Sequence, residues 1–303
     1  MNAVDALLAG LVDYAGLFPP ASQDMAQAVE SYATYLASGE REILGRFILP
    51  LARLSEFESI ASGYLPIGPE SEPWRLSVLV SGDIRGAAQQ VLAFNERHES
   101  VADSGNAVIE AVELKVERAA EVTAQIADLP AALTTYVEVP LGPAMTDTIR
   151  AVAQARGRAK VRTGGVTADA FPPAEQIVEF MSACRRFNVA FKATAGLHHP
   201  LRGNYRLTYK HGSAEGSMYG YLNVFLAAAL VYRGVPERQA LDLLLESDPS
   251  AFSFSDAAVE WRGIEIAFDE LRTVRENFAN SFGSCSFREP VDEIRELTST
   301  TFK

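Results

Sequence analysis

The chain has 303 residues, of which 48% are apolar and 22% are charged, and its formal net charge is −12. The apolar content is enough to build a sizeable core, which excludes an intrinsically disordered chain. The negative charge argues against a general nucleic-acid or anionic-membrane surface, because both need a basic face.

The sequence also bears on the compartment. Cys184 and Cys285 are the only cysteines, and they lie in unrelated segments, so we expect no disulfide framework. Residues 1–12 are apolar but lack a basic region and a cleavage site, so we do not expect a signal peptide. The longest apolar run, residues 224–232, is too short to cross a bilayer. A cytoplasmic protein without a membrane partner is the expectation.

Short β-rich runs alternate with helical patterns along most of the chain. Strands are predicted at residues 12–18, 46–49, 76–80, 108–116, 133–139, 159–162 and 189–195. Between them, helices are predicted at residues 24–37, 55–63, 84–98 and 119–127, in a segment ending near 156, and at 173–187. Strands that alternate with helices in this way are typical of parallel βαβ units.

The pattern changes after the seventh strand. A polar insertion at residues 198–217 is a candidate active-site loop, and helices at 218–233 and 236–246 follow it. The remaining predicted elements are an eighth strand at 252–254, a helix at 264–279 and a C-terminal tail at 281–303. No dinucleotide-binding glycine motif follows the first strand, which disfavours an open doubly wound sheet. We therefore expect one α/β domain over residues 1–303, a (β/α)8 TIM barrel.

Several predicted strands carry polar or charged residues where strands covered by helices should be apolar. These residues are Glu113, Lys115, Glu138, Lys160, Arg162, Lys192 and Thr194. Residues two apart on a strand share a face, so each pair points either at the helices or into the barrel. Lone charges buried against helices are costly, whereas charges at the C-terminal mouth can pair or reach a ligand. We expect these side chains to line an active site at that mouth.

Cations outnumber carboxylates in this set. The cations are Lys115, Lys160, Arg162, Lys192 and, in the following loop, Arg202. They meet only two predicted carboxylates, so we expect a small anionic ligand that carries phosphate or carboxylate. A structural ion-pair network that fills the barrel is the alternative interpretation.

Two segments resemble the deoxyribose-phosphate aldolase group of class I aldolases. Residues 160–165, KVRTGG, resemble that family's sixth-strand motif, and residues 192–196, KATAG, resemble its seventh-strand motif. The resemblance implies that Lys160 forms a Schiff base with a carbonyl substrate and that Lys192 lowers the pKa of Lys160. It also implies that an acid on the fourth strand transfers protons; here this is Glu113, where the family has aspartate.

A physical argument supports the same chemistry. A lysine nucleophile must be neutral, and lowering its pKa from about 10.4 to about 7 requires roughly 4–5 kcal/mol. Partial burial and a neighbouring cation can supply this. Arg162 stands where the family has a small residue, and residues 197–200 replace most of its phosphate-binding glycines. We therefore expect a substrate other than deoxyribose phosphate.

The histidines after the seventh strand are further candidates. His198 and His199 are adjacent, so their side chains diverge, and we expect one of them to contact substrate or transfer protons. Three metal ligands at a usual spacing are not visible, so neither a metal nor another cofactor is expected. Asp13, at the end of the first strand, is interpreted as structural, with pocket lining as the alternative.

The leading hypothesis is a lyase of the aldolase type that acts on a small anionic carbonyl compound. Lys160 would form the imine, Glu113 or Glu138 would carry protons, and Arg162 with Arg202 would hold the anion. The other hypotheses are a phosphoribosyl-transferring enzyme and a barrel that binds anions without catalysis. We expect no nucleic-acid partner, and a homo-oligomer is compatible with the sequence.

Overall fold

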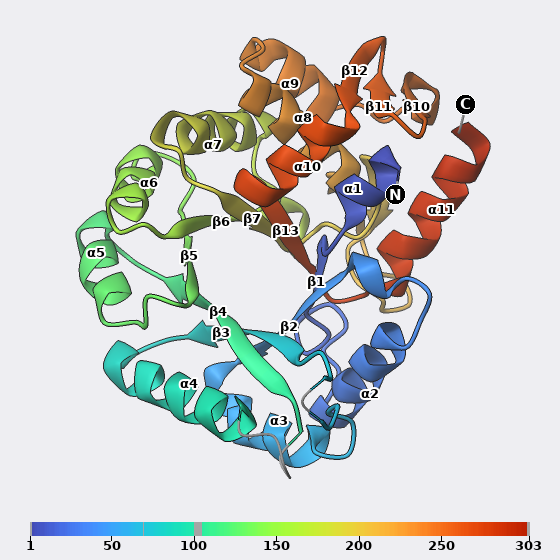
Figure 1. Cartoon of the computed structure of the whole chain (residues 1–303). Helices are drawn as coiled ribbons and strands as arrows, with labels where there is room; N and C mark the ends of the chain where they lie inside the picture. Colours follow the sequence, from blue (N-terminus) through green and yellow to red (C-terminus); the bar gives the residue numbers. More distant parts are fainter. Residues whose placement is uncertain (1, 69, 100–104, 302–303) are drawn as a thin grey trace.

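A closed barrel of eight parallel strands is present in the computed structural model, which describes residues 2–68, 70–99 and 105–301. The strands are β1 (Val12–Tyr14), β2 (Leu44–Pro50), β3 (Trp74–Val80), β4 (Ala107–Lys115), β5 (Thr134–Glu138), β6 (Arg158–Arg162), β7 (Phe191–Thr194) and β13 (Ala279–Ser284). They pair in the order β1-β13-β7-β6-β5-β4-β3-β2, and every pair is parallel (Figure 1). The predicted single-domain (β/α)8 barrel is confirmed.

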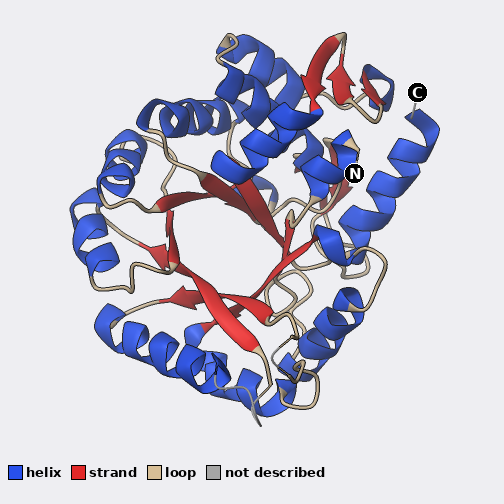
Figure 2. Ribbon diagram, in the orientation of Figure 1, coloured by secondary structure: helices blue, strands red, loops and turns tan. Residues whose placement is uncertain are grey.

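Helices form a ring around these strands (Figure 2). The strands β1 to β6 are followed in turn by α2 (Met25–Leu36), α3 (Leu54–Ala61), α4 (Ile84–Glu99), α5 (Ala119–Ala127), α6 (Met145–Gln154) and α7 (Ala174–Phe187). The remaining helices are α1 (Ala3–Leu8) before β1, then α8 (Tyr221–Arg233), α9 (Glu237–Leu244) and α10 (Phe268–Asn277) after β7, and α11 (Arg288–Thr301) after β13. Short 3₁₀ turns lie at Arg41–Ile43, Leu51–Arg53, Ala168–Ala170 and Pro249–Ala251.

Local sequence accounts for several helix ends. The side chain of Asp24 accepts a hydrogen bond from the backbone of Gln27, whose side chain accepts one from the backbone of Asp24, so α2 begins with a capping box. α7 is followed by Asn188 and α8 by Gly234, both in the left-handed conformation with φ of 54° and 87°. Each cap satisfies backbone groups that the helix itself leaves unpaired.

The inner helix α8 contains the longest apolar run of the sequence. It is buried along residues 221–231 because it packs against α7, α9, α10 and β13. Tyr221 stacks on Phe282 of β13, with ring centroids 5.1 Å apart. Within the described residues, no helix combines the length and the apolar character that a membrane crossing needs.

The eighth barrel strand is not where the sequence predicts it. Residues 252–254 form β10 (Phe252–Phe254), which belongs to a separate antiparallel sheet with β11 (Ala258–Trp261) and β12 (Ile264–Ala267). The predicted helix at 264–279 starts only with α10, and the predicted tail at 281–303 begins inside β13 and continues as α11. The sequence of β13, ANSFGS, has little apolar character, so the pattern does not predict a strand there. Contacts with distant segments hold β13 in place instead.

Arg275 of α10 provides one set of those contacts. Its buried guanidinium donates to the backbone carbonyls of Leu7, Ala9, Ala279 and Asn280. Burial among neutral acceptors lowers the pKa of Arg275 to about 10. The side chain therefore joins the segment before β1 to the start of β13, where the barrel closes.

The predicted insertion at residues 198–217 forms most of an antiparallel hairpin of β8 (Gly203–Arg206) and β9 (Glu215–Met218), which ends one residue later. The backbone N–H of Tyr221 donates to the carbonyl of His199. The segment is therefore attached to the start of α8, and its histidines lie just beyond the C-terminal end of β7.

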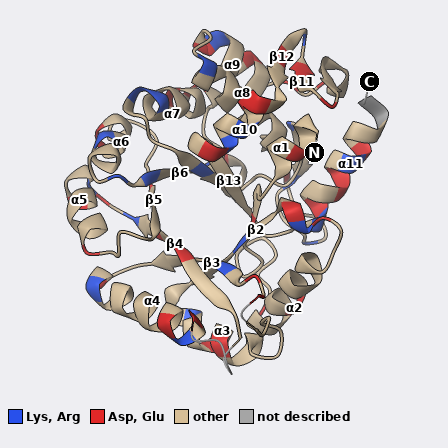
Figure 3. Cartoon of the chain, viewed as in Figure 1, with Lys and Arg blue, Asp and Glu red and all other residues tan. Residues whose placement is uncertain are grey.

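Charges of both signs are spread over the outer helices (Figure 3). Many of them pair within one helix, as Arg150 does with Asp147 and Arg238 with Asp242, at 2.9 and 3.0 Å. Exposed pairs of this kind contribute about 0–1 kcal/mol each. The architecture that positions the site therefore depends on the buried core.

Candidate active site

A pocket of about 260 Å³ opens at the C-terminal ends of the barrel strands. Every barrel strand from β2 to β7, together with β13 and the loop after β1, contributes to its wall. The lining residues are Ala15, Phe18, Pro19, Pro20, Ile48, Leu79, Glu113, Glu138, Lys160, Arg162, Gly165, Val166, Thr194, Ala195, Gly196, His198, Gly283 and Cys285. This is the end of the barrel at which (β/α)8 enzymes bind their substrates.

Glu113 bridges two lysines at the base of the pocket. Lys160 and Lys192 occupy paired positions on β6 and β7. Oε2 of Glu113 lies 3.1 Å from Nζ of Lys160, and its Oε1 lies 2.9 Å from Nζ of Lys192. The glutamate comes from β4 and reaches the lysines across the barrel interior. Three side chains that the sequence analysis proposed for catalysis therefore meet in one place.

Lys192 lies beneath the pocket and does not line it. Only 1% of the residue is exposed, and its Nζ contacts Oδ2 of Asp13 at 2.6 Å. Burial alone would lower the pKa of Lys192, but the charges of Asp13 and Glu113 outweigh burial and raise this pKa above its usual range. The positive charge of Lys192 is therefore balanced by the two carboxylates that contact it. These carboxylates neutralise the charge of the lysine that was predicted to act on Lys160 as a neighbouring cation.

The same contacts keep Glu113 ionised. Burial favours the neutral acid, yet the charges of Lys192 and Lys160 hold the pKa of Glu113 well below its usual range. Ser77 of β3 also donates to Oε1 of Glu113, at 2.9 Å. Lys160, Lys192 and Ser77 therefore hold the ionised carboxylate of Glu113 in one position.

Lys160 has a different environment, because its amine reaches the pocket. Its Nζ lies 3.0 Å from Oε2 of Glu138, in addition to the contact with Glu113. The side chain of Glu138 is 16% exposed, whereas that of Glu113 is 3% exposed. Lys160 is thus held between a buried carboxylate and one that faces the pocket.

Asp13 is the partner that the sequence analysis did not assign to the lysines. It is fully buried and accepts hydrogen bonds from Lys192, from the hydroxyl of Ser281 and from the backbone N–H of Arg46. The charges of Lys192 and Arg46 overcome the effect of burial and lower the pKa of Asp13. A carboxylate in the short buried strand β1 is the signal for such a partner, since it requires a cation. Two lysines therefore meet three carboxylates, and the predicted excess of cations does not extend to the barrel interior.

A guanidinium lies at the mouth of the pocket. Arg162 is exposed at the end of β6 and forms no ion pair within the part of the chain that the structure describes. Thr194 lines the same wall. Lys115 lies outside the pocket, in an adjoining depression of about 370 Å³ that shares Glu138 and Arg162 with it. Arg162 is therefore the cation that can meet an anion at both openings.

The loop after β7 brings one histidine to the pocket. Only His198 is among the residues that line it, although both histidines face α11. Nδ1 of His198 lies 3.2 Å from Oε2 of Glu289, and Nδ1 of His199 lies 2.8 Å from Oε1 of Glu293. Arg202 does not line the pocket, and its backbone N–H donates to Asn223 of α8. The structure therefore does not bring Arg202 together with Arg162 in the lining of this pocket.

No family model and no curated protein matches this chain. Similar solved structures include nitroalkane oxidase from Streptomyces ansochromogenes, with 15% identity, a TM-score of 0.33 and coverage of 65% of this chain. The chain spans 62% of the length of that oxidase. The spore cortex-lytic enzyme SleL from Bacillus cereus has 11% identity, a TM-score of 0.39 and coverage of 97% of this chain and 74% of its own. At these values an activity can be inferred only from the residues of the site itself.

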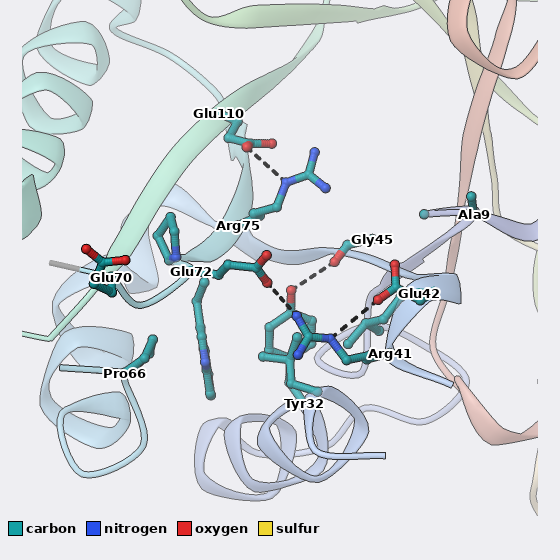
Figure 4. A pocket seen from close by; sticks show the side chains of 15 residues that line it. Ala9, Tyr32, Arg41, Glu42, Gly45, Pro66, Glu70, Glu72, Arg75 and Glu110 are labelled. Carbon is teal, nitrogen blue, oxygen red and sulfur yellow. Dashed lines mark hydrogen bonds and ion pairs between the residues drawn. The ribbon is translucent and has the colours of Figure 1, made fainter. Parts of the chain in front are cut away.

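A larger cavity, of about 1070 Å³, lies at the N-terminal ends of the strands (Figure 4). Its arginines are paired: Arg41 contacts Glu42 and Glu72, and Arg75 contacts Glu110. Among the described residues that line it there is no lysine or histidine. Residues at this end of a (β/α)8 barrel contribute to stability rather than to catalysis. The candidate active site is therefore the smaller pocket, which contains Lys160.

Proposed function

We propose that this protein is a lyase of the imine-forming, class I aldolase type, which acts on a small anionic carbonyl compound through Lys160. The observation that carries the proposal is a lysine amine in a pocket at the C-terminal ends of the strands, between two carboxylates. The resemblance of residues 160–165 and 192–196 to aldolase strand motifs supports the same chemistry.

The amine of Lys160 must lose a proton before it attacks a carbonyl carbon. Glu138 is suited to accept that proton, because its carboxylate lies 3.0 Å from Nζ and faces the pocket. Glu113 is less suited, since Lys192 stabilises its ionised form. Glu138 is therefore the proposed proton carrier, and Glu113 is the residue that positions the amine.

The proposed reaction balances with these groups alone. Addition of the Lys160 amine to the carbonyl gives a carbinolamine, and loss of water, with a proton returned by Glu138, gives an iminium ion. Glu138 then takes the proton of a hydroxyl on the carbon β to the iminium carbon, the carbon–carbon bond breaks to release a carbonyl product, and its electron pair forms an enamine, to whose carbon Glu138 returns the proton. Addition of water then releases the second product and restores the amine.

The rest of the pocket supports a small anionic substrate. A volume of about 260 Å³ lies below the range of about 300–1,000 Å³ that is usual for larger ligands. Arg162 presents a planar guanidinium at the mouth, which can bind a carboxylate or phosphate with two hydrogen bonds. Among the described lining residues, Arg162 and Lys160 are the only lysine or arginine side chains, which is few for the binding of pyrophosphate by a phosphoribosyl-transferring enzyme.

Borohydride trapping tests the proposal. The full chain is incubated with a panel of short 2-oxo acids and hydroxyaldehydes, reduced with sodium borohydride, digested and analysed by mass spectrometry. We expect a reduced adduct on Lys160 and none in Lys160→Arg, whereas Lys115→Arg serves as the matched control and keeps the adduct. If no compound of the panel leaves a reduced adduct on Lys160, or if Lys160→Arg cleaves a substrate as fast as the wild type, the imine mechanism is overturned. Anion binding without turnover would instead support the non-catalytic barrel.

A further inference from the structure

His199 and two glutamates of α11 converge next to the active-site pocket. One nitrogen of His199 and one carboxylate oxygen each from Glu289 and Glu293 lie within 4.8 Å of one another. The glutamates are four residues apart, so they share a face of the helix. Nδ1 of His199 lies 2.8 and 2.9 Å from the two oxygens of Glu293. Three ligand-type atoms are therefore close enough to contact one ion.

His198 provides a second and independent observation. Only 8% of this residue is exposed, and within the described structure its buried Nδ1 has no hydrogen-bond partner. That nitrogen lies 3.2 Å from Oε2 of Glu289 without meeting the geometry of a hydrogen bond, so it lies beside the three clustered groups. A buried polar atom without a partner is uncommon and calls for an explanation such as an ion. The unsatisfied nitrogen of His198 therefore points to a fourth ligand.

Neighbouring side chains hold these groups in place. The ring of His199 stacks on Tyr205, with centroids 3.5 Å apart, and the carbonyl of His199 accepts a hydrogen bond from the backbone of Tyr221. The hydroxyl of Tyr209 donates to Oε2 of Glu289 at 2.9 Å. Contacts of this kind orient the ligands of metal sites. These contacts orient the loop and the helix without a contribution from an ion.

The charge of the cluster also favours a cation. Among the described residues, neither Glu289 nor Glu293 pairs with a lysine or an arginine. Two carboxylates beside two imidazoles therefore form a site that a divalent ion would neutralise. Imidazole nitrogen together with carboxylate oxygen is a ligand set for Zn²⁺ and related first-row ions, whereas Mg²⁺ and Ca²⁺ prefer oxygen alone.

We propose that His198, His199, Glu289 and Glu293 form a site for a divalent first-row transition-metal ion. The ion joins the loop after β7 to α11 at the rim of the barrel, beside the pocket that His198 lines. This inference does not depend on the proposed lyase activity. Ligand spacing in the sequence does not indicate this site, because His199 and Glu293 are 94 residues apart.

Cobalt titration of the full chain tests the site. The protein is treated with a chelator, dialysed and titrated with Co²⁺, whose visible absorption becomes intense in a four-coordinate site. We expect a saturable absorption band at a single Co²⁺ for each chain, which Zn²⁺ abolishes and Mg²⁺ leaves unchanged. The absence of a band with the wild-type chain, or displacement by Mg²⁺ as readily as by Zn²⁺, would overturn the proposal.

Substitutions identify the ligands. Glu293→Gln and His198→Asn should weaken Co²⁺ binding by more than the roughly 10- to 100-fold that loss of an outer-shell partner costs, and Tyr209→Phe should fall within that range. Glu296→Gln removes the same charge from an exposed position of α11 and is the matched control, with wild-type affinity expected. Wild-type affinity in Glu293→Gln would contradict the assignment. The wild-type titration decides the existence of the site even where a variant does not fold.

Discussion

Lys160 and Lys192 are direct neighbours in the pairing of β6 with β7, yet only Lys160 reaches the pocket. The two oxygens of Glu113 contact one lysine each, so one carboxylate serves a buried cation and a pocket cation at the same time. Lys192 also contacts the carboxylate of Asp13, which lies below the pocket. Lys160 also contacts the carboxylate of Glu138, which lines the pocket. The two lysines should therefore respond differently to substitution.

Replacing Lys192 should mainly affect stability. Lys192→Met leaves Asp13 buried without its cation, and breaking a buried pair in this way costs about 3–5 kcal/mol. Lys160→Met, the matched change on the neighbouring strand, should cost less, because Glu113 keeps Lys192 and Glu138 can reach solvent. Urea unfolding of both variants measures the difference. Equal losses of unfolding free energy would show that the lysines are equivalent.

The buried network should make stability depend on pH in a defined direction. The lowered pKa values of Asp13 and Glu113 contribute stability that is fully present above their unfolded-chain values of about 4 and is lost as pH falls further. The raised pKa of Lys192 contributes stability that is fully present below about 10.4 and is lost as pH rises through its folded value. The contribution of the network should therefore be constant between about pH 5 and about pH 10.

Glu113→Gln provides the control for this pH dependence. The variant should be less stable at neutral pH, but its unfolding free energy should fall less between about pH 6 and about pH 3.5, because one carboxylate with a lowered pKa is missing. Urea unfolding at both pH values gives the two differences. An identical acid-side loss in the variant and the wild type would exclude Glu113 as a source.

Arg162 should determine the affinity for anions. Arg162→Met removes the guanidinium at the mouth, and the affinity for a short 2-oxo acid should fall roughly 10- to 100-fold, since a charge-assisted hydrogen bond contributes about 1.5–3 kcal/mol. Lys115→Met removes a cation from the adjoining depression and should have a much smaller effect. Calorimetric titration measures both. A larger loss with Lys115→Met would place the anion in the depression instead.

A side chain at Gly196, in the pocket wall, should lower the free energy of unfolding. It has a φ of 74°, and a Cβ there would lie 2.8 Å from Cα of Gly164. Gly82 has a similar φ of 81° but open space around it, so Gly82→Ala isolates the backbone cost of about 1–2 kcal/mol. Gly196→Ala should cost a further 1–3 kcal/mol, roughly, from overpacking. Equal unfolding free energies for the two variants would show that the pocket wall can move.

Much of the barrel could be predicted because its signals are local. The β-rich runs up to β7 are short apolar segments between helices, and a period of two residues places Lys160 with Arg162, and Lys192 with Thr194, on shared strand faces. β13 was not predicted, since its polar sequence gains its partners only from β1, β7 and Arg275. Residues 252–254 were predicted as a barrel strand because they form a short apolar run. In the structure they form β10, which pairs with β11 outside the barrel.

The sequence by itself determined the fold class and predicted the neighbouring lysines of β6 and β7. Only the tertiary structure decided which lysine reaches the pocket, that Asp13 neutralises the other, and that His198 and His199 face α11. The physical reason is sequence separation. Periodicity reports which face of its own strand a side chain takes, whereas the charge that meets it comes from segments as far as 179 residues away.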